Sequence, residues 1–306
     1  MYLGIHHSVE QVFPPGVLRD ELADVGPVGV VPDDAALGDC DGLVTFAYDA
    51  AFLEADLGWI HSIQAGVDRF PFAELERRGI RLTNSTGIHG DAVGETVVGY
   101  MTAFARRLHA HRSSQERREW SWPAWDEPFT LSGERATVVG LGTLGRGVAA
   151  RADALGMDVT GVKRTPIPVD HVGTVLTPDD LQEAVADARF VVLAVPLTDG
   201  TEGLVGAPEL DAMREDAYLV NVARGPVIDQ DALVAALEAG GIAGAALDVF
   251  EREPLPEDSP LWDMDEVIVT PHAAAATRDY YRRITTLVRE NYRRFDRGES
   301  PVNAVV

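Results

Sequence analysis

Short apolar runs and helical patterns alternate along residues 1–85. Where apolar and β-branched residues follow one another over a few positions, we expect strands, at Tyr2–Ile5, Val28–Val31, Leu43–Phe46, Trp59–Ile63 and Arg81–Thr83. Between these runs, apolar residues recur at helical spacing in Gly16–Val25, Tyr48–Ala55 and Phe72–Arg78. Because strands alternate with helices, the pattern predicts βαβ units and therefore a parallel sheet.

A long amphipathic helix is predicted to begin at Asp91, after the polar, turn-rich stretch Asn84–Gly90. Its apolar side chains share one face at helical spacing, namely Val93, Val97, Tyr100, Met101, Phe104 and Leu108. The charged stretch Arg112–Arg118 comes next and is expected to be solvated. This helix would lead the chain into a second domain.

The second half of the chain repeats the alternation. The expected strands are Thr137–Val139, Val159–Val162, Phe190–Val195, Ala217–Val222, Ala243–Asp248 and Val267–Val269. The expected helices are Pro178–Val185, Glu209–Met213, Gln230–Ala239 and a last one from Thr277 through Tyr292. We therefore expect two doubly wound, parallel-sheet α/β domains linked by crossing helices, one formed by residues 1–94 and 278–306 and the other by residues 95–277.

A glycine-rich turn follows the strand Thr137–Val139. Gly140, Gly142 and Gly145 are spaced G-x-G-x-x-G, and a helical pattern follows them. In a dinucleotide-binding turn the first glycine allows the tight turn, the second lets a pyrophosphate approach the backbone, and the third lets the helix lie close to the strand. The helix N-terminus then offers N–H groups to the phosphates. With a strand before it and a helix after it, the motif predicts a Rossmann-type nucleotide site rather than an ordinary tight turn.

The composition indicates a folded and strongly acidic protein. Hydrophobic residues make up 46% of the 306 positions, which is ample for two cores, and Cys40 is the only cysteine, which excludes an intrachain disulfide. Asp and Glu number 49 against 26 Lys and Arg, a net charge of −23, so nucleic acid and anionic membranes are poor partners. Because neither a charged-then-apolar leader nor a long apolar run is present, we expect a cytoplasmic protein.

The charge also predicts a dependence on salt. Lys163 is the only lysine, and an acidic, lysine-poor surface resembles that of proteins from salt-in haloarchaea. At low ionic strength so large a charge repels itself, so we expect the fold to need concentrated salt. An ordinary acidic mesophilic protein is the alternative.

Three of the five tryptophans, Trp120, Trp122 and Trp125, lie within six residues. Clustered tryptophans beside a loop are typical of a protein–protein contact. We expect a homodimer arm here. A lid over the chain's own helices is the alternative.

Four more segments place polar groups at the expected carboxyl ends of strands, where open parallel sheets bind ligands. They are Val195–Thr198 with Thr201, Asn221–Pro226, Leu247–Pro254 and Thr270–Ala274. Together with the glycine turn they resemble the D-specific 2-hydroxyacid dehydrogenase family, and the resemblance covers nearly the whole chain. It implies a flavodoxin-like substrate domain, a Rossmann cofactor domain and hydride transfer between a nicotinamide cofactor and a small 2-oxo or D-2-hydroxy acid.

Reducing a 2-oxo acid also needs a proton donor for the carbonyl oxygen and an anchor for the carboxylate. Arg224 matches the family's substrate-binding arginine, whose planar fork pairs bidentately with a carboxylate. His272 matches the family's general acid, and Glu253, which directly precedes Pro254, matches the carboxylate that hydrogen-bonds this histidine. The alternatives are a surface ion pair for Arg224, a structural histidine and a loop carboxylate.

The same resemblance places Asp248 near the nicotinamide, where it would help to hold the carboxamide. Ala65 and Gly66, after a strand of the first domain, are expected to contact the substrate together with Arg224 and His272. No dedicated metal site is expected. The expected cofactor contacts are Gly140, Gly142, Thr143, Leu144, Gly145, Lys163, Arg164, Thr165, Val195, Pro196, Thr201, Val222, Ala223, Asp248, His272 and Ala274.

The choice of cofactor is predicted from the end of the strand Val159–Val162. An NAD enzyme carries an acid here for the ribose 2′-OH, whereas this chain reads Lys163-Arg164-Thr165, which suits the 2′-phosphate of NADP(H). We therefore expect NADP(H) to be preferred and NAD(H) to be possible. The predicted protein is a 2-oxo acid reductase. A glyoxylate/hydroxypyruvate reductase is the alternative within the enzyme class, and a nucleotide-sensing regulator on the same fold is the alternative outside it.

Overall fold

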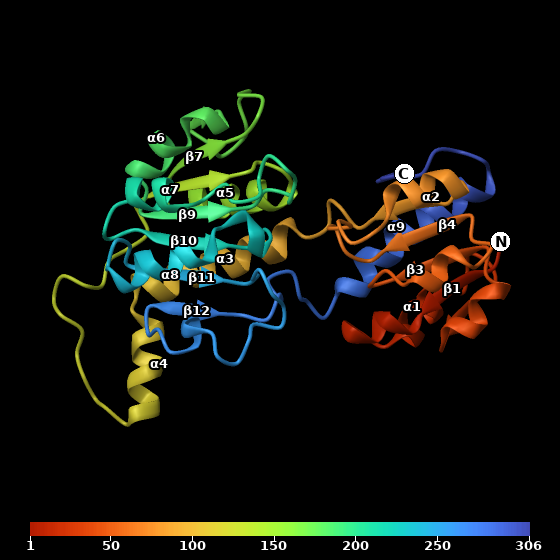
Figure 1. Ribbon diagram of the computed structural model, residues 1–306, viewed down its shortest axis with the longest axis horizontal. Helices are drawn as coiled ribbons and strands as arrows, with labels where there is room; N and C mark the ends of the chain where they lie inside the picture. The colour runs from red at the N-terminus through yellow and green to blue at the C-terminus, as the bar shows by residue number, and fades with distance from the viewer. The chain divides into compact units, whose positions relative to one another are not determined.

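The computed structural model describes all residues, 1–306, and forms two compact units (Figure 1). Unit 1 comprises Met1–Ile88 and Ala276–Val306, and unit 2 comprises His89–Ala275. Each is built on a parallel sheet, so the predicted fold class is confirmed. The division made from the sequence differs at residues 89–94, which the structure groups with unit 2, and at residues 276–277, which it groups with unit 1. The reason for the first difference is that helix α3 (Gly90–Ala105) packs as one piece against α5 (Thr143–Ala154), both within unit 2.

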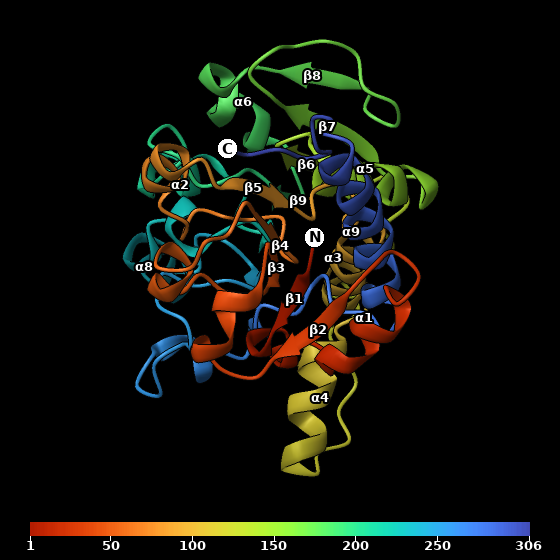
Figure 2. The ribbon, with the colours of Figure 1, turned by 90° about the vertical axis from the view of Figure 1, so that its right-hand side faces the viewer.

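The sheet of unit 1 has the strand order β2-β1-β3-β4-β5, all parallel. Its strands are β1 (Leu3–His6), β2 (Val28–Val31), β3 (Gly42–Thr45), β4 (Trp59–Ser62) and β5 (Arg81–Asn84). Figure 2 shows α1 (Pro15–Glu21) and α9 (Tyr280–Asp296) side by side. They pack against a core that includes Leu3, Ile5 and Trp59, while α2 (Phe72–Arg78) packs against a second cluster around Leu43 and Ile60. The helix expected at Tyr48–Ala55 is only a short 3-10 helix, Ala50–Leu53.

A buried polar network lies inside unit 1. His61 is fully buried, with its two ring nitrogens 2.8 Å from Thr83 Oγ1 and 3.2 Å from Ser85 Oγ. Burial lowers the pKa of His61 to about 3, so the ring is neutral at working pH. This histidine therefore has a structural role.

The sheet of unit 2 has seven parallel strands in the order β12-β11-β10-β9-β6-β7-β8. Strands β6 to β11 have the order 6-5-4-1-2-3 of a Rossmann fold, and β12 adds a seventh strand at one edge. The strands are β6 (Arg135–Val139), β7 (Asp158–Val162), β8 (Thr174–Leu176), β9 (Phe190–Leu193), β10 (Tyr218–Asn221), β11 (Gly244–Leu247) and β12 (Val267–Val269). Strand β8 was not predicted, because its three residues lie at the sheet edge and carry no long apolar run.

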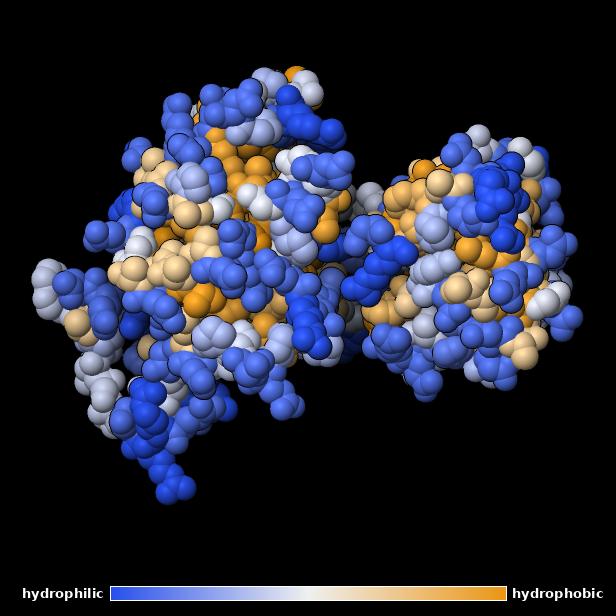
Figure 3. Space-filling model, in the orientation of Figure 1, coloured by the Kyte–Doolittle hydropathy of each residue, from blue (hydrophilic) through white to orange (hydrophobic).

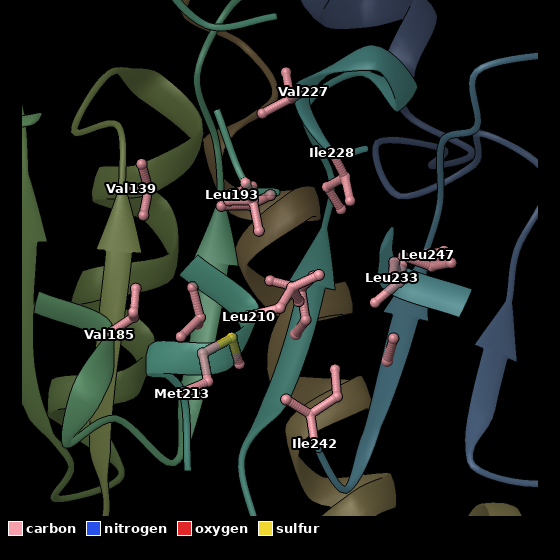
Figure 4. Packing of buried hydrophobic residues seen from close by; sticks show 14 of the residues in the cluster. Val139, Val185, Leu193, Leu210, Met213, Val227, Ile228, Leu233, Ile242 and Leu247 are labelled. Carbon is pink, nitrogen blue, oxygen red and sulfur yellow. The ribbon is translucent and has the colours of Figure 1, made fainter. Parts of the chain in front are cut away.

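Alternate residues of these strands supply two cores. On β9, Val191 and Leu193 belong to a cluster with α6 (Leu181–Ala186), α7 (Ala207–Ala212) and α8 (Gln230–Glu238), part of which Figure 4 shows. Phe190 and Val192 belong to the other cluster, with α3 and α5. Helices therefore cover both faces of the sheet. Burial of each such side chain stabilises the fold by roughly 1.5–3 kcal/mol.

The long helix predicted from Asp91 through Leu108 ends earlier than expected. Helix α3 stops at Ala105, Arg107 adopts the left-handed φ of 56°, and a separate helix α4 (Leu108–Arg117) begins. Leu108 is 52% exposed, so its placement on the buried face was wrong, whereas Val93 and Phe104 are buried as predicted. Helix α4 extends away from the rest of unit 2, and its residues are largely hydrophilic (Figures 1 and 3). None of the helices combines the length and the apolar composition that a bilayer span requires.

Candidate active site

The glycine turn lies where the strand order of unit 2 changes direction, between β6 and β9. Gly140 has a φ of 98°, and a Cβ atom there would lie 2.6 Å from the carbonyl oxygen of Ala194. A Cβ atom at Gly145 would lie 1.8 Å from the carbonyl oxygen of Gly140. Only glycine fits either position, so the turn is tight and α5 lies close against β6.

The start of α5 is open to a ligand. Gly142 is its N-cap, and no side chain accepts a hydrogen bond from the first N–H groups of the helix. A Cβ atom at Gly142 would meet no heavy atom within 4 Å. Thr143 and Leu144 form the first turn of this 12-residue helix. Open space in front of unsatisfied N–H groups fits a pyrophosphate, which makes this edge suitable for a dinucleotide.

Two basic side chains follow β7. Lys163 donates its backbone N–H to the carbonyl oxygen of Leu176 at 3.1 Å, and its side chain is half-buried, while Arg164 and Thr165 are exposed. Neither Lys163 nor Arg164 forms an ion pair, although the chain carries 49 acidic residues. The end of β7 therefore presents positive charge that no carboxylate neutralises.

The loop after β9 is closed by its own hydroxyl groups. Thr201 Oγ1 donates to the carbonyl oxygen of Pro196 at 2.6 Å and accepts from the backbone N–H of Thr198 at 2.9 Å. These bonds fix the segment from Val195 to Thr201 beside the glycine turn, because Ala194 N donates to the carbonyl oxygen of Val139 at 2.8 Å. The loop therefore borders the glycine turn at the carboxyl end of the sheet, where a nucleotide would bind.

Arg224 follows β10 and is positioned by Asn221. The buried Asn221 side chain donates to the carbonyl oxygen of Arg224 at 3.0 Å and accepts from the N–H of Ala223 at 3.0 Å. Next to it, a Cβ atom at Gly225 would lie 1.9 Å from the carbonyl carbon of Phe250, so glycine lets this loop contact the loop after β11. Val222 and Ala223 are buried under the turn.

Glu253 and His272 form a hydrogen-bonded pair. Glu253 Oε2 lies 2.9 Å from His272 Nδ1, and Glu253 Oε1 accepts from the backbone N–H of Phe250 at 3.2 Å. His272 has a φ of 53°, a left-handed conformation that histidine adopts more readily than most side chains. With Nδ1 directed at the carboxylate, Nε2 is the ring atom that can exchange a proton with a bound molecule. The imidazole is 39% exposed, so this atom can be reached.

Asp248 holds the turn that carries His272. Its buried carboxylate accepts from Thr270 Oγ1 at 2.6 Å, from the N–H of Ala273 at 2.8 Å and from the N–H of Ala274 at 2.9 Å. The His272 N–H donates to the Asp248 carbonyl oxygen at 2.8 Å. The sequence assigned Asp248 to the cofactor carboxamide, whereas these bonds show that its carboxylate also organises the 270–274 turn.

Three supporting residues were missed by sequence reasoning. They are Asn221, Thr270 and Tyr100, whose hydroxyl lies 2.7 Å from Thr270 Oγ1. Burial raises the pKa of Tyr100 to about 12, so it stays protonated and can donate to Thr270, which in turn donates to Asp248. Asn at a strand end, two residues before Ala223, is an Asx-turn signal that could have been found. The Tyr100 contact spans 170 positions and leaves no local signal.

The predicted site residues of unit 2 therefore lie at one edge of one sheet. Arg224, Asp248 with Glu253, and His272 follow the adjacent parallel strands β10, β11 and β12, whose register pairs Asn221 with Leu247 and Leu247 with Val269. A guanidinium, a carboxylate–imidazole pair and a glycine turn at one sheet edge suit carboxylate binding and proton transfer beside a nucleotide. Ala65 and Gly66 belong to unit 1, where the carbonyl oxygen of Ala65 accepts from the Asn84 side chain at 2.6 Å.

Comparison with known proteins agrees with this arrangement. The family model of the NAD-binding domain of D-isomer specific 2-hydroxyacid dehydrogenases matches residues 98–274. A glyoxylate reductase of Korarchaeum cryptofilum is 36% identical over 280 residues, covering 87% of this chain and 83% of that protein. A glyoxylate reductase of Thermococcus litoralis is 34% identical over 302 residues, covering 95% and 87%.

Solved structures give the same result. The structure of a D-isomer specific 2-hydroxyacid dehydrogenase from Xanthobacter autotrophicus, in complex with NADPH and MES, superimposes with a TM-score of 0.84. The two proteins share 31% sequence identity, and the match covers 100% of this chain and 98% of that one. The glycine turn, the strand order and the matches together show that the chain belongs to the D-isomer specific 2-hydroxyacid dehydrogenase family and is an NAD(P)-dependent oxidoreductase of 2-oxo and 2-hydroxy acids.

Proposed function

We propose that the protein is a cytoplasmic, NADPH-linked reductase that converts small 2-oxo acids to D-2-hydroxy acids. The observation that carries the cofactor choice is the unneutralised pair Lys163 and Arg164 at the end of β7. Glyoxylate is the first substrate to consider, because several relatives are glyoxylate reductases. When bound, the nicotinamide cofactor supplies the hydride.

In this proposal the protein's own groups bind, orient and protonate the substrate. Arg224 pairs with the substrate carboxylate, because its planar fork matches the two oxygens and Asn221 fixes its backbone. His272 gives the proton on Nε2 to the carbonyl oxygen of the substrate. Glu253 holds Nδ1 at 2.9 Å, which stabilises the imidazolium before the proton is given up and keeps the ring oriented.

The glycine turn and the loops after β7 and β9 hold the nucleotide. Gly140, Gly142 and Gly145 with Thr143 and Leu144 receive the pyrophosphate, and Lys163, Arg164 and Thr165 receive the 2′-phosphate of the ribose. Val195, Pro196 and Thr201 border the cofactor on the β9 side. Val222, Ala223, Asp248 and Ala274 border its nicotinamide end.

A spectrophotometric screen tests this function. The purified protein is assayed in molar KCl with glyoxylate, hydroxypyruvate, pyruvate and longer 2-oxo acids, each with NADPH and with NADH. We expect consumption of NADPH with at least one of these acids and formation of the D-hydroxy acid, identified by chiral chromatography. Binding of the nucleotide with no turnover of any 2-oxo acid would instead favour a nucleotide-sensing regulator.

We also propose that the enzyme is a homodimer that uses the segment Trp120–Trp125 as an arm. Trp120, Trp122 and Trp125 are 96%, 89% and 93% exposed. They follow the projecting helix α4, and the arm is anchored at Phe129, whose N–H donates to the carbonyl oxygen of Ala105 at 2.9 Å. Residues of α4 and the arm line a hollow of about 710 Å³. Each indole buries about 150–250 Å² in a contact, so leaving three in water favours an interface.

The arm can be tested by sedimentation in high salt at micromolar protein. We expect the mass of two 33.0 kDa chains for the wild type and of one chain when Trp120, Trp122 and Trp125 are all replaced by Ser. Trp262→Ser is the matched control, because Trp262 is 51% exposed but lies outside the arm, and it should leave the mass unchanged. A monomeric wild type, or a dimer that survives the triple replacement, contradicts the arm.

A further inference from the structure

A second group of ligating side chains lies in unit 1, at the carboxyl ends of β1 and β2. His6 ends β1, His7 begins the 3-10 helix that follows, and Asp34 begins the 3-10 helix after β2. One ring nitrogen of each histidine and one carboxylate oxygen of Asp34 lie within 4.8 Å of one another. None of these residues has a part in the proposed reaction.

The position of this cluster in the fold favours a ligand site. The sheet order β2-β1-β3-β4-β5 changes direction at β1 and β3, and open parallel sheets bind ligands outside the carboxyl ends of the strands at such a point. His6, His7 and Ser8 follow β1 there, and Thr45 ends β3. Ser8 Oγ and Thr45 Oγ1 lie 3.0 Å apart, which joins the two strand ends.

Ser8 lies behind the ring of His6 and contacts its Nδ1 atom with two groups. Thr45 Oγ1 donates to the carbonyl oxygen of Ala47 at 2.6 Å, so it can only accept from Ser8 Oγ. Ser8 Oγ lies 2.9 Å from His6 Nδ1, and the backbone N–H of Ser8 donates to the same ring atom at 3.4 Å. When Nδ1 instead carries the ring proton, it can donate to Ser8 Oγ, and the lone pair of Nε2 is then available to an ion.

His6 Nε2 also faces a negative charge. It lies 3.2 Å from Asp34 Oδ1, and either a ring proton or a metal ion can lie between the two atoms. The distance suits a metal, because ligands at about 2.0–2.1 Å from a tetrahedral Zn²⁺ are roughly 3.3 Å apart.

The other two ligands can complete such a site. The ring of His7 lies 4.1 Å from that of His6, centre to centre, and both His7 and Asp34 are exposed, so their side chains can rotate onto an ion. His6 is only 3% exposed and is held by Ser8, as expected of a ligand oriented by a hydrogen bond behind it. Two imidazoles and a carboxylate form a borderline-soft N,N,O set with one open position, which Zn²⁺ accepts.

We propose that His6, His7 and Asp34 bind one zinc ion, with water at the fourth position. The sequence showed no metal motif, because the two histidines are adjacent rather than spaced for one helix face, and Asp34 is 28 positions from His6. The site belongs to unit 1 and does not depend on the proposed cofactor preference or substrate.

Zinc titration of the full-length protein tests this site. The protein is stripped with a chelator, desalted in high KCl and titrated with Zn²⁺ against a chromogenic competitor. We expect one tight equivalent, and a Co²⁺ derivative with the visible absorption of a tetrahedral site. His7→Ala and Asp34→Asn each remove a ligand and should weaken zinc binding by at least about tenfold, and Ser8→Ala, which keeps all three ligands, by about 10–100-fold.

Two control variants separate this site from other histidines. His171→Ala disrupts the exposed pair of His171 and Asp153, 2.8 Å apart, and His272→Asn disrupts the pair with Glu253. Neither should change the tight equivalent, and thermal melts check that every variant is folded. Absence of a tight equivalent in the wild type, or its retention in both His7→Ala and Asp34→Asn, would overturn the proposal and would indicate a His6 that only hydrogen-bonds Asp34.

Discussion

Replacing His272 by Asn should lower kcat for 2-oxo acid reduction by about 10²–10⁴, the usual contribution of a positioned acid–base group. Asn keeps a polar side chain and tolerates the left-handed φ of 53° at this position, so the turn should persist. The loss then reports the missing proton donor rather than a misfolded loop. Stopped-flow or steady-state assays under matched salt measure it, and near-normal turnover of the variant would refute the assignment of His272 as the general acid.

Glu253→Gln provides the matched variant, because it keeps the size of the side chain and removes its charge. In the wild type the carboxylate, 2.9 Å from Nδ1, accepts a hydrogen bond from the ring and keeps it oriented. Without that charge the imidazolium that donates the proton loses its partner, so kcat for reduction should fall. Arg224→Ala should act differently, mostly by raising KM.

The architecture was predictable because its signals are local. The apolar runs at Val28–Val31 and Val267–Val269 coincide with β2 and β12, and the glycine spacing located the nucleotide turn at the correct strand end. Helix ends were less predictable. Leu108 continues the apolar spacing of α3, but Arg107 adopts a left-handed conformation, and no pattern of apolar residues encodes that break.

The residues of the candidate site show the same contrast between local and distant signals. Arg224, Glu253 and His272 could be predicted as site residues because each lies in a short segment after a strand. The residues that hold them were harder to find. Asp248 accepts from groups 22 to 26 positions away, and Tyr100 contacts Thr270 across 170 positions. The cluster of His6, His7 and Asp34 was not predicted from the sequence for the same reason, because only the pairing of β1 with β2 in the sheet brings these residues together.

Lys163→Asp should reverse or abolish a preference for NADPH over NADH. A chain that otherwise uses only Arg as its strong base places its single Lys directly after β7, where an NAD enzyme carries an acid. A charge-assisted hydrogen bond contributes about 1.5–3 kcal/mol, so one or two such bonds to the 2′-phosphate imply a preference of about ten- to several-hundred-fold. Concentrated salt screens the exposed Arg164, so we expect the lower part of this range.

The decisive measurement is the ratio of kcat/KM with NADPH to that with NADH, for both proteins in the same KCl. Arg293→Asp is the matched control, because it makes the same change of charge at an exposed position of α9 in unit 1 and should leave the ratio unaltered. A higher kcat/KM with NADH in the unmodified protein would contradict the assignment, because the charge after β7 would then not be contacting a 2′-phosphate.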